Sequence, residues 1–249
     1  MSADHELAAQ VPVPSAYDEP YRVLACDRVT PTIAELWLRP LGAGLQHLPG
    51  EYVLLEDDER AMPPRSYSIA NAPRSDGALS LLVTRVPDGV VSTWVHERLR
   101  VGELVRLSGP YGTFVDDPVA TEPALLLAAG SGLAPIRALL ESALAAGRRR
   151  RLTLMFSARS ETDVIDRERF CDWQASEPRF RFVRTLTRGP GPPPHGRLPA
   201  LLPRLCPDLS AYDVFIAGAP GFVRACAIAV DALGARSARI HTEVFFVEP

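Results

Sequence analysis

The 249-residue sequence has no closely spaced cysteines. Its cysteines are scattered along the chain, at Cys26, Cys171, Cys206 and Cys226. There is no CxxC pair and none of the clustering that an iron–sulfur site requires. We therefore expect isolated reduced thiols and no built-in iron–sulfur relay. The histidines show no metal-ligand spacing with Cys, Asp or Glu, so we expect no metal site.

Long hydrophobic runs and an excess of one charge are also missing. No apolar run approaches the roughly 20 residues needed to span a bilayer, and the first ten residues carry acids rather than a signal-peptide pattern. The formal net charge is −3, whereas nucleic-acid binding usually needs a strongly basic balance or stripe. We expect a cytoplasmic protein that binds neither membranes nor nucleic acid.

The first half of the chain has the pattern of an antiparallel barrel. Residues 1–19 are small and polar without a clear period, which predicts a flexible leader. From residue 20 to 118, short segments rich in Val, Leu and aromatics alternate with turn residues. Strands are expected near 21–27, 32–39, 52–56, 65–70, 79–85 and 104–108, and one helix near 91–99. This regular spacing is typical of a β-barrel.

The second half, residues 119–249, alternates apolar strands with helices. Residues 124–128 form a continuous apolar run, which is typical of a parallel strand buried on both faces. Strands are expected near 124–128, 151–157, 180–185, 213–217 and 240–246, and helices near 135–146, 163–174, 198–202 and 221–233. This alternation predicts an α/β domain with a doubly wound parallel sheet. The domain boundary is expected near 116–122.

One glycine-rich turn suits an anionic cofactor. Gly130, Ser131 and Gly132 follow an apolar strand and precede a helix that has Pro135 in its first turn. Glycine lets the backbone approach a phosphate, and the start of a helix carries partial positive charge. A tight structural turn would explain the same residues.

Two further segments in the first half could hold an anion. Arg65 can grip a phosphate through two parallel N–H bonds, and Tyr67 projects from the same strand face, where it could lie against a flat ring. The alternative is a plain edge strand. After Gly89, Ser92 is a natural N-cap for the predicted helix, although the helix start could also bind an anion.

Together, and in this order, these segments resemble the ferredoxin–NADP reductase superfamily, in particular the reductase components of bacterial oxygenases. The resemblance covers about residues 20–246. It rests on six motifs in register: Arg65-Ser66-Tyr67-Ser68 (RxYS), Gly89 to Thr93, Gly109 to Phe114 (GPxGxF), Gly130 to Pro135 (GTGxxP, with Ser for Thr), Gly218 to Gly221, and Glu243 to Phe246 (ExF).

The resemblance implies a role for each matching residue. The FAD side would comprise Arg65, Gly89, Ser92 and Thr93 at the pyrophosphate, Tyr67 against the flavin, Ser68 near its N5 atom, Val83 and Arg85 along the flavin, and Glu243 with Phe245 or Phe246 on its far side. The nicotinamide side would comprise Gly130, Ser131, Gly132 and Pro135 at the pyrophosphate, Ser157 and Arg159 near the adenosine, and Gly218, Pro220 and Phe222 beside the nicotinamide. Ser68 and Glu243 would act at the reacting atoms as positioning residues.

The implied activity is electron transfer from NADH or NADPH through FAD to a separate ferredoxin or oxygenase component. NADH is favoured because Glu161 and Asp163 would repel a 2′-phosphate, although Arg159 and Arg188 could bind one. Two alternatives stay open: a reductase of free flavin, and an FAD-binding electron-transfer subunit of a larger complex. The second is motivated by Ala217, where relatives often carry a cysteine that helps to place the nicotinamide.

Overall fold

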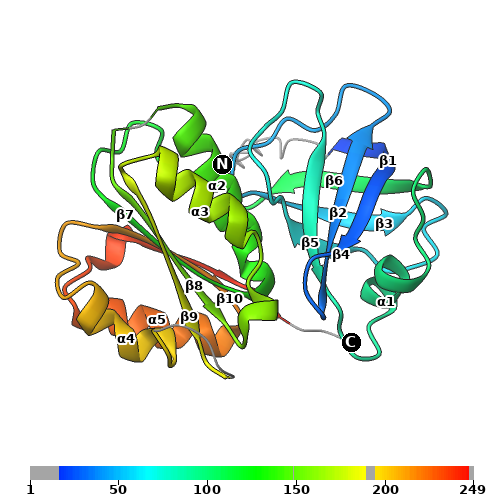
Figure 1. Ribbon diagram of the computed structural model, residues 1–249. Helices are drawn as coiled ribbons and strands as arrows, with labels where there is room; N and C mark the ends of the chain where they lie inside the picture. Colours follow the sequence, from blue (N-terminus) through cyan, green and yellow to red (C-terminus); the bar gives the residue numbers. More distant parts are fainter. Residues whose placement is uncertain (1–16, 148, 189–193, 247–249) are drawn as a thin grey trace, which may run out of the picture.

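The computed structural model describes residues 17–147, 149–188 and 194–246 of the protein. It shows a β-barrel with one helix beside an α/β domain, and the two pack side by side (Figure 1). The expected fold class is confirmed. In the described part of the chain, no helix is both long and apolar enough to cross a membrane.

The barrel is a six-stranded antiparallel sheet in the order β4-β3-β6-β1-β2-β5. Its strands are β1 (Tyr17–Arg28), β2 (Ile33–Pro40), β3 (Tyr52–Asp57), β4 (Arg65–Ser68), β5 (Leu79–Thr84) and β6 (Leu104–Tyr111). A bridge between Ile69 and Leu81 connects the two edge strands and nearly closes the sheet. Closure leaves few exposed strand edges. Because β1 starts at Tyr17, residues 17–19 belong to the barrel and not to the predicted leader, whose residues 1–16 lie outside the described residues.

Helix α1 (Val90–Glu97) closes one end of the barrel with its buried residues Val91 and Val95. Its N-cap is Gly89, and the prediction that Ser92 caps the helix is wrong. Ser92 lies inside the first turn, where its Oγ accepts a hydrogen bond from the backbone N–H of Val86 at 3.1 Å. The hydroxyl therefore ties the helix to the preceding loop.

The α/β domain has a five-stranded parallel sheet in the order β11-β10-β7-β8-β9. Its strands are β7 (Ala124–Ala129), β8 (Leu152–Ala158), β9 (Phe180–Leu186), β10 (Asp213–Gly218) and β11 (Ile240–Val244), and its helices are α2 (Leu133–Ala145), α3 (Arg167–Ser176), α4 (Leu198–Leu205) and α5 (Pro220–Ala232). Helices α2 and α3 cover one face, and α4 and α5 cover the other (Figure 1). Both faces of the sheet are therefore buried, as the apolar strands require.

Helix α3 is shorter than the predicted helix 163–174 at its start. A separate 3₁₀ turn (Glu161–Asp163) precedes it, and Asp166 has a positive φ of 54° that interrupts the helical path. The helix therefore begins at Arg167.

One hydrophobic core runs across the boundary between the domains. The buried cluster beneath α2 contains sheet residues such as Leu126 and Phe215 together with Ile33, Leu82 and Phe114 from the first domain and the linker. The rings of Phe114 and Phe215 meet edge to face with centroids 5.7 Å apart. Shared apolar burial of this kind opposes relative motion of the two domains.

Candidate active site

The two domains meet around a cavity of about 620 Å³. The barrel contributes β4, one face of β5 and the start of α1. The α/β domain contributes the carboxyl ends of β7 and β10, the turn at residues 130–132 and the residues that end β11. Strand β7 has β8 on one side and β10 on the other, so the cavity lies at the topological switch point where open α/β sheets bind ligands.

Strand β4 forms the barrel wall of this cavity with Arg65, Ser66, Tyr67 and Ser68. Desolvation raises the pKa of Tyr67 to about 12, although Arg65 lowers it somewhat. Tyr67 thus stays a neutral, largely apolar surface at physiological pH, which is suited to contact with a planar ring. Arg65 adds a cation on the same strand face.

The glycine turn of the α/β domain forms the opposite wall. Gly130 has a φ of +57°, and a Cβ atom added to it would meet nothing within 4 Å, so the backbone there faces open space. Gly132 is tightly packed: an added Cβ would lie 2.3 Å from the carbonyl oxygen of Ala217. Glycine at 132 therefore lets the turn lie directly against the end of β10.

Two side-chain hydrogen bonds cross the cavity between the domains. Ser68 Oγ donates to Glu243 Oε2 at 3.1 Å, and Thr84 Oγ1 donates to Ser131 Oγ at 2.8 Å. Burial raises the pKa of Glu243 to about 7, and the bond from Ser68 lowers it less than burial raises it. A carboxyl group with a pKa near neutral therefore lines the site.

The cavity brings together most of the residues singled out from the sequence. They are Arg65, Tyr67, Ser68, Gly89, Ser92, Gly130, Ser131, Gly132, Gly218, Glu243, Phe245 and Phe246. These residues come from five separate stretches of the chain. The residues nearest the mouth include Val90 and Phe246, which are 51% and 73% exposed.

Other predicted residues do not line this cavity. Val83 points into the barrel core, and its carbonyl oxygen lies 2.9 Å from His96 Nε2. Arg85 forms an ion pair with Glu97 at 2.5 Å. The remaining ones are Thr93 in α1, Pro135 in α2, Ser157 at the end of β8, Arg159 beyond it, and Pro220 and Phe222 at the start of α5.

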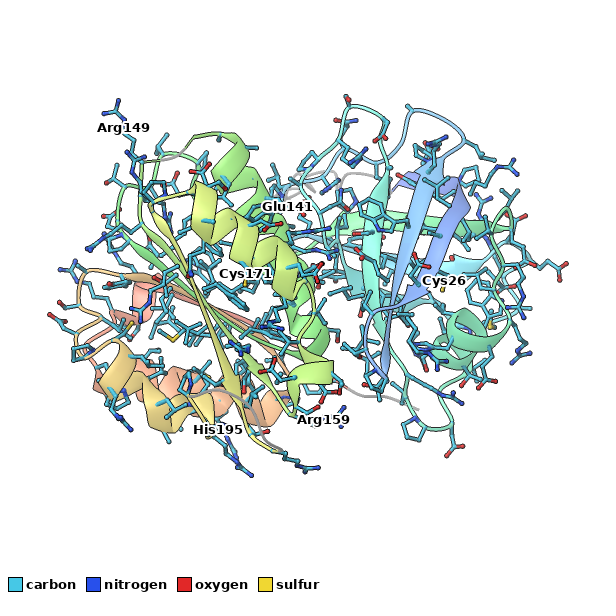
Figure 2. All side chains as sticks on the ribbon, viewed as in Figure 1. Cys26, Glu141, Arg149, Arg159, Cys171 and His195 are labelled. Atoms are coloured by element: carbon cyan, nitrogen blue, oxygen red, sulfur yellow. The ribbon has the colours of Figure 1, made fainter. Side chains whose placement is uncertain are left out.

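Arg159 lies at the border between the domains (Figure 2). It is 56% exposed on its side chain, pairs with Asp163 at 3.2 Å and contacts Thr32 Oγ1 at 3.4 Å. Ser157 is on the carboxyl side of β8, paired in register with Ala129 at the end of β7. Both residues therefore lie at the carboxyl end of the parallel sheet, as the cavity does, but they do not line the cavity.

Sequence reasoning missed several lining residues. They include Tyr52, Leu82, Thr84, Val86 and Ala129. The alternation of side chains along a strand was the available signal, because residues on either side of a core-facing Val83 must face the opposite way. Leu82 and Thr84 do so and line the cavity.

The residues around the cavity fit a flavin dinucleotide and a second dinucleotide. Arg65 and the start of α1 provide a cation and backbone N–H groups for a pyrophosphate. Tyr67 offers a neutral aromatic surface. At Gly89 an added Cβ would lie 2.7 Å from Ser92 Oγ, so a larger residue would disturb this turn. Opposite them, the open backbone of Gly130 suits close approach of a second phosphate.

Comparison with known proteins agrees with both halves of this site. Residues 32–115 match the oxidoreductase FAD-binding domain, and residues 126–227 match the oxidoreductase NAD-binding domain. The reductase component of the naphthalene 1,2-dioxygenase/salicylate 5-hydroxylase systems of Ralstonia sp. is 33% identical over 226 residues, which cover 90% of this chain and 68% of that protein. Ferredoxin–NADP reductase B of Sorangium cellulosum is 36% identical over 189 residues, 72% of this chain and 77% of that protein.

Solved structures show the same two-domain arrangement. The cytochrome P450 reductase GcoB of Amycolatopsis is 29% identical, with a TM-score of 0.86 over 92% of this chain and 70% of that chain. The ferredoxin reductase in carbazole 1,9a-dioxygenase is 26% identical, with a TM-score of 0.84 over 94% of this chain and 71% of that chain. The chain therefore belongs to the ferredoxin–NAD(P) reductase family and is a flavin-dependent NAD(P)H oxidoreductase with an FAD-binding barrel and an NAD-binding α/β domain.

Proposed function

We propose that this oxidoreductase takes electrons from NADH and passes them, by way of FAD, to a separate ferredoxin or oxygenase component. The observation that carries the proposal is the shared cavity, onto which both β4 of the barrel and the glycine turn at 130–132 open. A reductase needs its two cofactors within contact distance, and one cavity between two cofactor-binding domains provides that.

On the barrel side, Arg65 and the first turn of α1 would hold the FAD pyrophosphate. Ser92 and Thr93 follow the N-cap Gly89 in that turn. Tyr67 would pack against the flavin, and Val83 and Arg85 would contribute backbone. The chemistry that bound FAD supplies is acceptance of a hydride from reduced nicotinamide and release of electrons one at a time.

On the α/β side, the turn at 130–132 and the start of α2 with Pro135 would receive the nicotinamide cofactor's pyrophosphate. Gly218, Pro220 and Phe222 would flank its nicotinamide, and Ser157 and Arg159 would lie near its adenosine. Phe245 and Phe246 would shield the far side of the flavin pocket.

Ser68 and Glu243 would position and polarise the reacting atoms. Glu243 can hold a proton on its carboxyl group at physiological pH because burial raises its pKa to about 7. The Ser68 hydroxyl fixes that carboxyl group from the other domain. Their contact would place a nearly neutral, hydrogen-bonded pair of side chains beside the atoms between which the hydride moves.

The preference for NADH is supported by the charges beyond β8. Arg184 binds both carboxylate oxygens of Glu161, with distances of 2.9 to 3.2 Å, and this bond lowers the pKa of Glu161. Asp163 is fixed by the N–H and hydroxyl of Ser160. Two fixed carboxylates would repel a 2′-phosphate, and two of the neighbouring cations, Arg159 and Arg184, are already paired with them.

The proposed acceptor is supported by the relatives, whose names describe reductase components of oxygenase systems. The sequence itself has no clustered cysteines to carry an iron–sulfur relay. A cytoplasmic location remains a prediction.

Purification followed by rapid mixing tests the proposal. We expect a yellow protein with about one FAD per chain, whose flavin is bleached faster by NADH than by NADPH, and which then reduces an added ferredoxin. A colourless protein that reduces added FMN would instead show a free-flavin reductase. A yellow protein that neither nucleotide bleaches would show an electron-transfer subunit.

A further inference from the structure

Helix α2 carries a buried arginine that reaches across the domain boundary. The Arg137 side chain is fully buried. Its Nε donates to the carbonyl oxygen of Ala70 at 2.5 Å, its Nη1 to Asp166 at 2.6 Å, and its Nη2 to Glu35 at 2.5 Å and Ser80 Oγ at 2.9 Å. Burial alone would lower the pKa of Arg137, but Asp166 and Glu35 outweigh it and raise the pKa above its ordinary value. Arg137 is therefore a permanent cation joined to both domains.

One turn further along α2, Glu141 makes the complementary contact. Its Oε2 accepts a hydrogen bond from the backbone N–H of Ala72 at 2.9 Å, and its Oε1 accepts from Arg169 Nη1 at 3.0 Å. Figure 2 shows Glu141 at the border between α2 and the barrel loops. Along the helix, the donor Arg137 is followed by the acceptor Glu141. Along the barrel loop, the carbonyl group of Ala70 is followed by the N–H group of Ala72.

The spacing of these two contacts matches on both sides. Arg137 and Glu141 are four residues apart on a helix, which is about 6 Å along its axis. Ala70 and Ala72 are two residues apart in the loop after β4, on either side of a bend at Asn71. Shifting the helix by one residue along this loop would break both bonds, because the donor and the acceptor would no longer face their partners. The contacts therefore fix a register between the domains.

The contacts of Arg137 and Glu141 lie close in sequence to both walls of the active-site cavity. Ala70 lies two residues after Ser68 of β4, and Arg137 lies one helical turn after Leu133, which directly follows the glycine turn at 130–132. The two walls of the cavity are thus joined one turn behind it. We infer that Arg137 and Glu141 form a clasp that holds the nicotinamide-binding turn at the correct distance from the flavin-binding strand, and that both are positioning residues for hydride transfer. This inference rests on the proposed function.

The test separates position from folding. Removing the Arg137 charge would leave Glu35 and Asp166 buried without their partner, which is strongly destabilising. Glu141 is partly exposed, so Glu141→Ala removes one point of the clasp at lower cost. Arg137→Lys keeps the charge but loses the fork of donors, and Glu141→Gln keeps an acceptor for Ala72. Glu168→Ala makes the same chemical change as Glu141→Ala at an exposed position of α3 and serves as the control.

Three measurements on the FAD-loaded protein decide the inference. They are FAD content, hydrogen exchange of the segment 69–73, and the rate of flavin reduction at saturating NADH. For Glu141→Ala and Arg137→Lys we expect retained FAD, lost protection at 69–73 and reduction about 10- to 100-fold slower, because small misplacements of reactants cost that much. Glu141→Gln should restore most of the rate, and Glu168→Ala should behave like the wild type.

Glu141→Ala that loses protection at 69–73 but reduces flavin at the wild-type rate would overturn the clasp. Lower thermal stability with an unchanged rate would do the same, because it would show a structural role only. If Arg137→Lys does not fold, Glu141→Ala and Glu141→Gln decide alone. A wild-type protein that neither nucleotide reduces would count against the proposed function instead.

Discussion

Ser68 of the barrel donates a hydrogen bond to Glu243 of the α/β domain, and the two residues are 175 positions apart in the chain. A single neutral donor compensates poorly for the burial of a carboxylate, so the pKa of Glu243 rises to about 7 from an ordinary 4.5. Between these pH values the folded protein holds a proton that the unfolded chain has released. The burial of Glu243 therefore makes stability depend on pH.

The first prediction concerns the direction of that dependence. Because the folded state binds the extra proton, the free energy of unfolding should fall as pH rises from about 4.5 to about 7 and change no further above that range. A pKa change of this size sets an upper limit of about 3 kcal/mol. Urea unfolding of the FAD-free protein at pH 5 and pH 8 measures it. Glu243→Gln should lack this component, so parallel pH dependence in both proteins would contradict the assignment.

The second prediction concerns the packing of the glycine turn. An alanine at Gly132 would place its Cβ 2.3 Å from Ala217 O and 2.6 Å from Gly218 N, both of which are backbone atoms. Gly132→Ala should therefore lower the free energy of unfolding by about 2 kcal/mol or more. Gly221→Ala is the matched control: its Cβ meets nothing within 4 Å in the first turn of α5, so thermal unfolding should show an unchanged or slightly raised Tm.

The third prediction concerns the cation on β4. If Arg65 binds the FAD pyrophosphate, Arg65→Ala should weaken FAD binding about 10- to 100-fold, which is the cost of losing hydrogen bonds to a charged group. Fluorescence titration of the FAD-free protein measures the dissociation constant. Arg98→Ala removes an exposed arginine from the end of α1 and should leave the constant unchanged. Undiminished flavin content of Arg65→Ala after dialysis would refute the role.

The sequence was sufficient for the architecture because its periodic patterns are local. The apolar run at 124–128 predicted a buried parallel strand, and the structure has β7 there. The predictions failed where a choice between neighbouring residues depended on backbone conformation. The N-cap of α1 is Gly89 and not the predicted Ser92. A positive φ at Asp166 makes α3 begin at Arg167, later than predicted.

The active site was less predictable because its contacts join distant parts of the chain. The motif at 65–68 and the glycine turn at 130–132 were visible, and both line the cavity. Arg137 was overlooked, since its partners are provided by the folded barrel. A lone arginine within the apolar stretch 133–140 was the available signal, because a charge on a buried helix face requires partners.

The last prediction concerns the choice between NADH and NADPH. Glu161 holds Arg184 in a two-bonded ion pair beyond the end of β8, so it would both repel a 2′-phosphate and occupy a nearby cation. Glu161→Gln removes one negative charge and weakens that hold, and the preference in kcat/KM for NADH over NADPH should fall about tenfold, equivalent to about 1.4 kcal/mol. Steady-state kinetics with both nucleotides at low salt measures it, and Glu168→Gln on the exposed surface of α3 is the control. Added salt should shrink the difference because it screens exposed charges. An unchanged ratio in Glu161→Gln would mean that the adenosine ribose binds away from this ion pair.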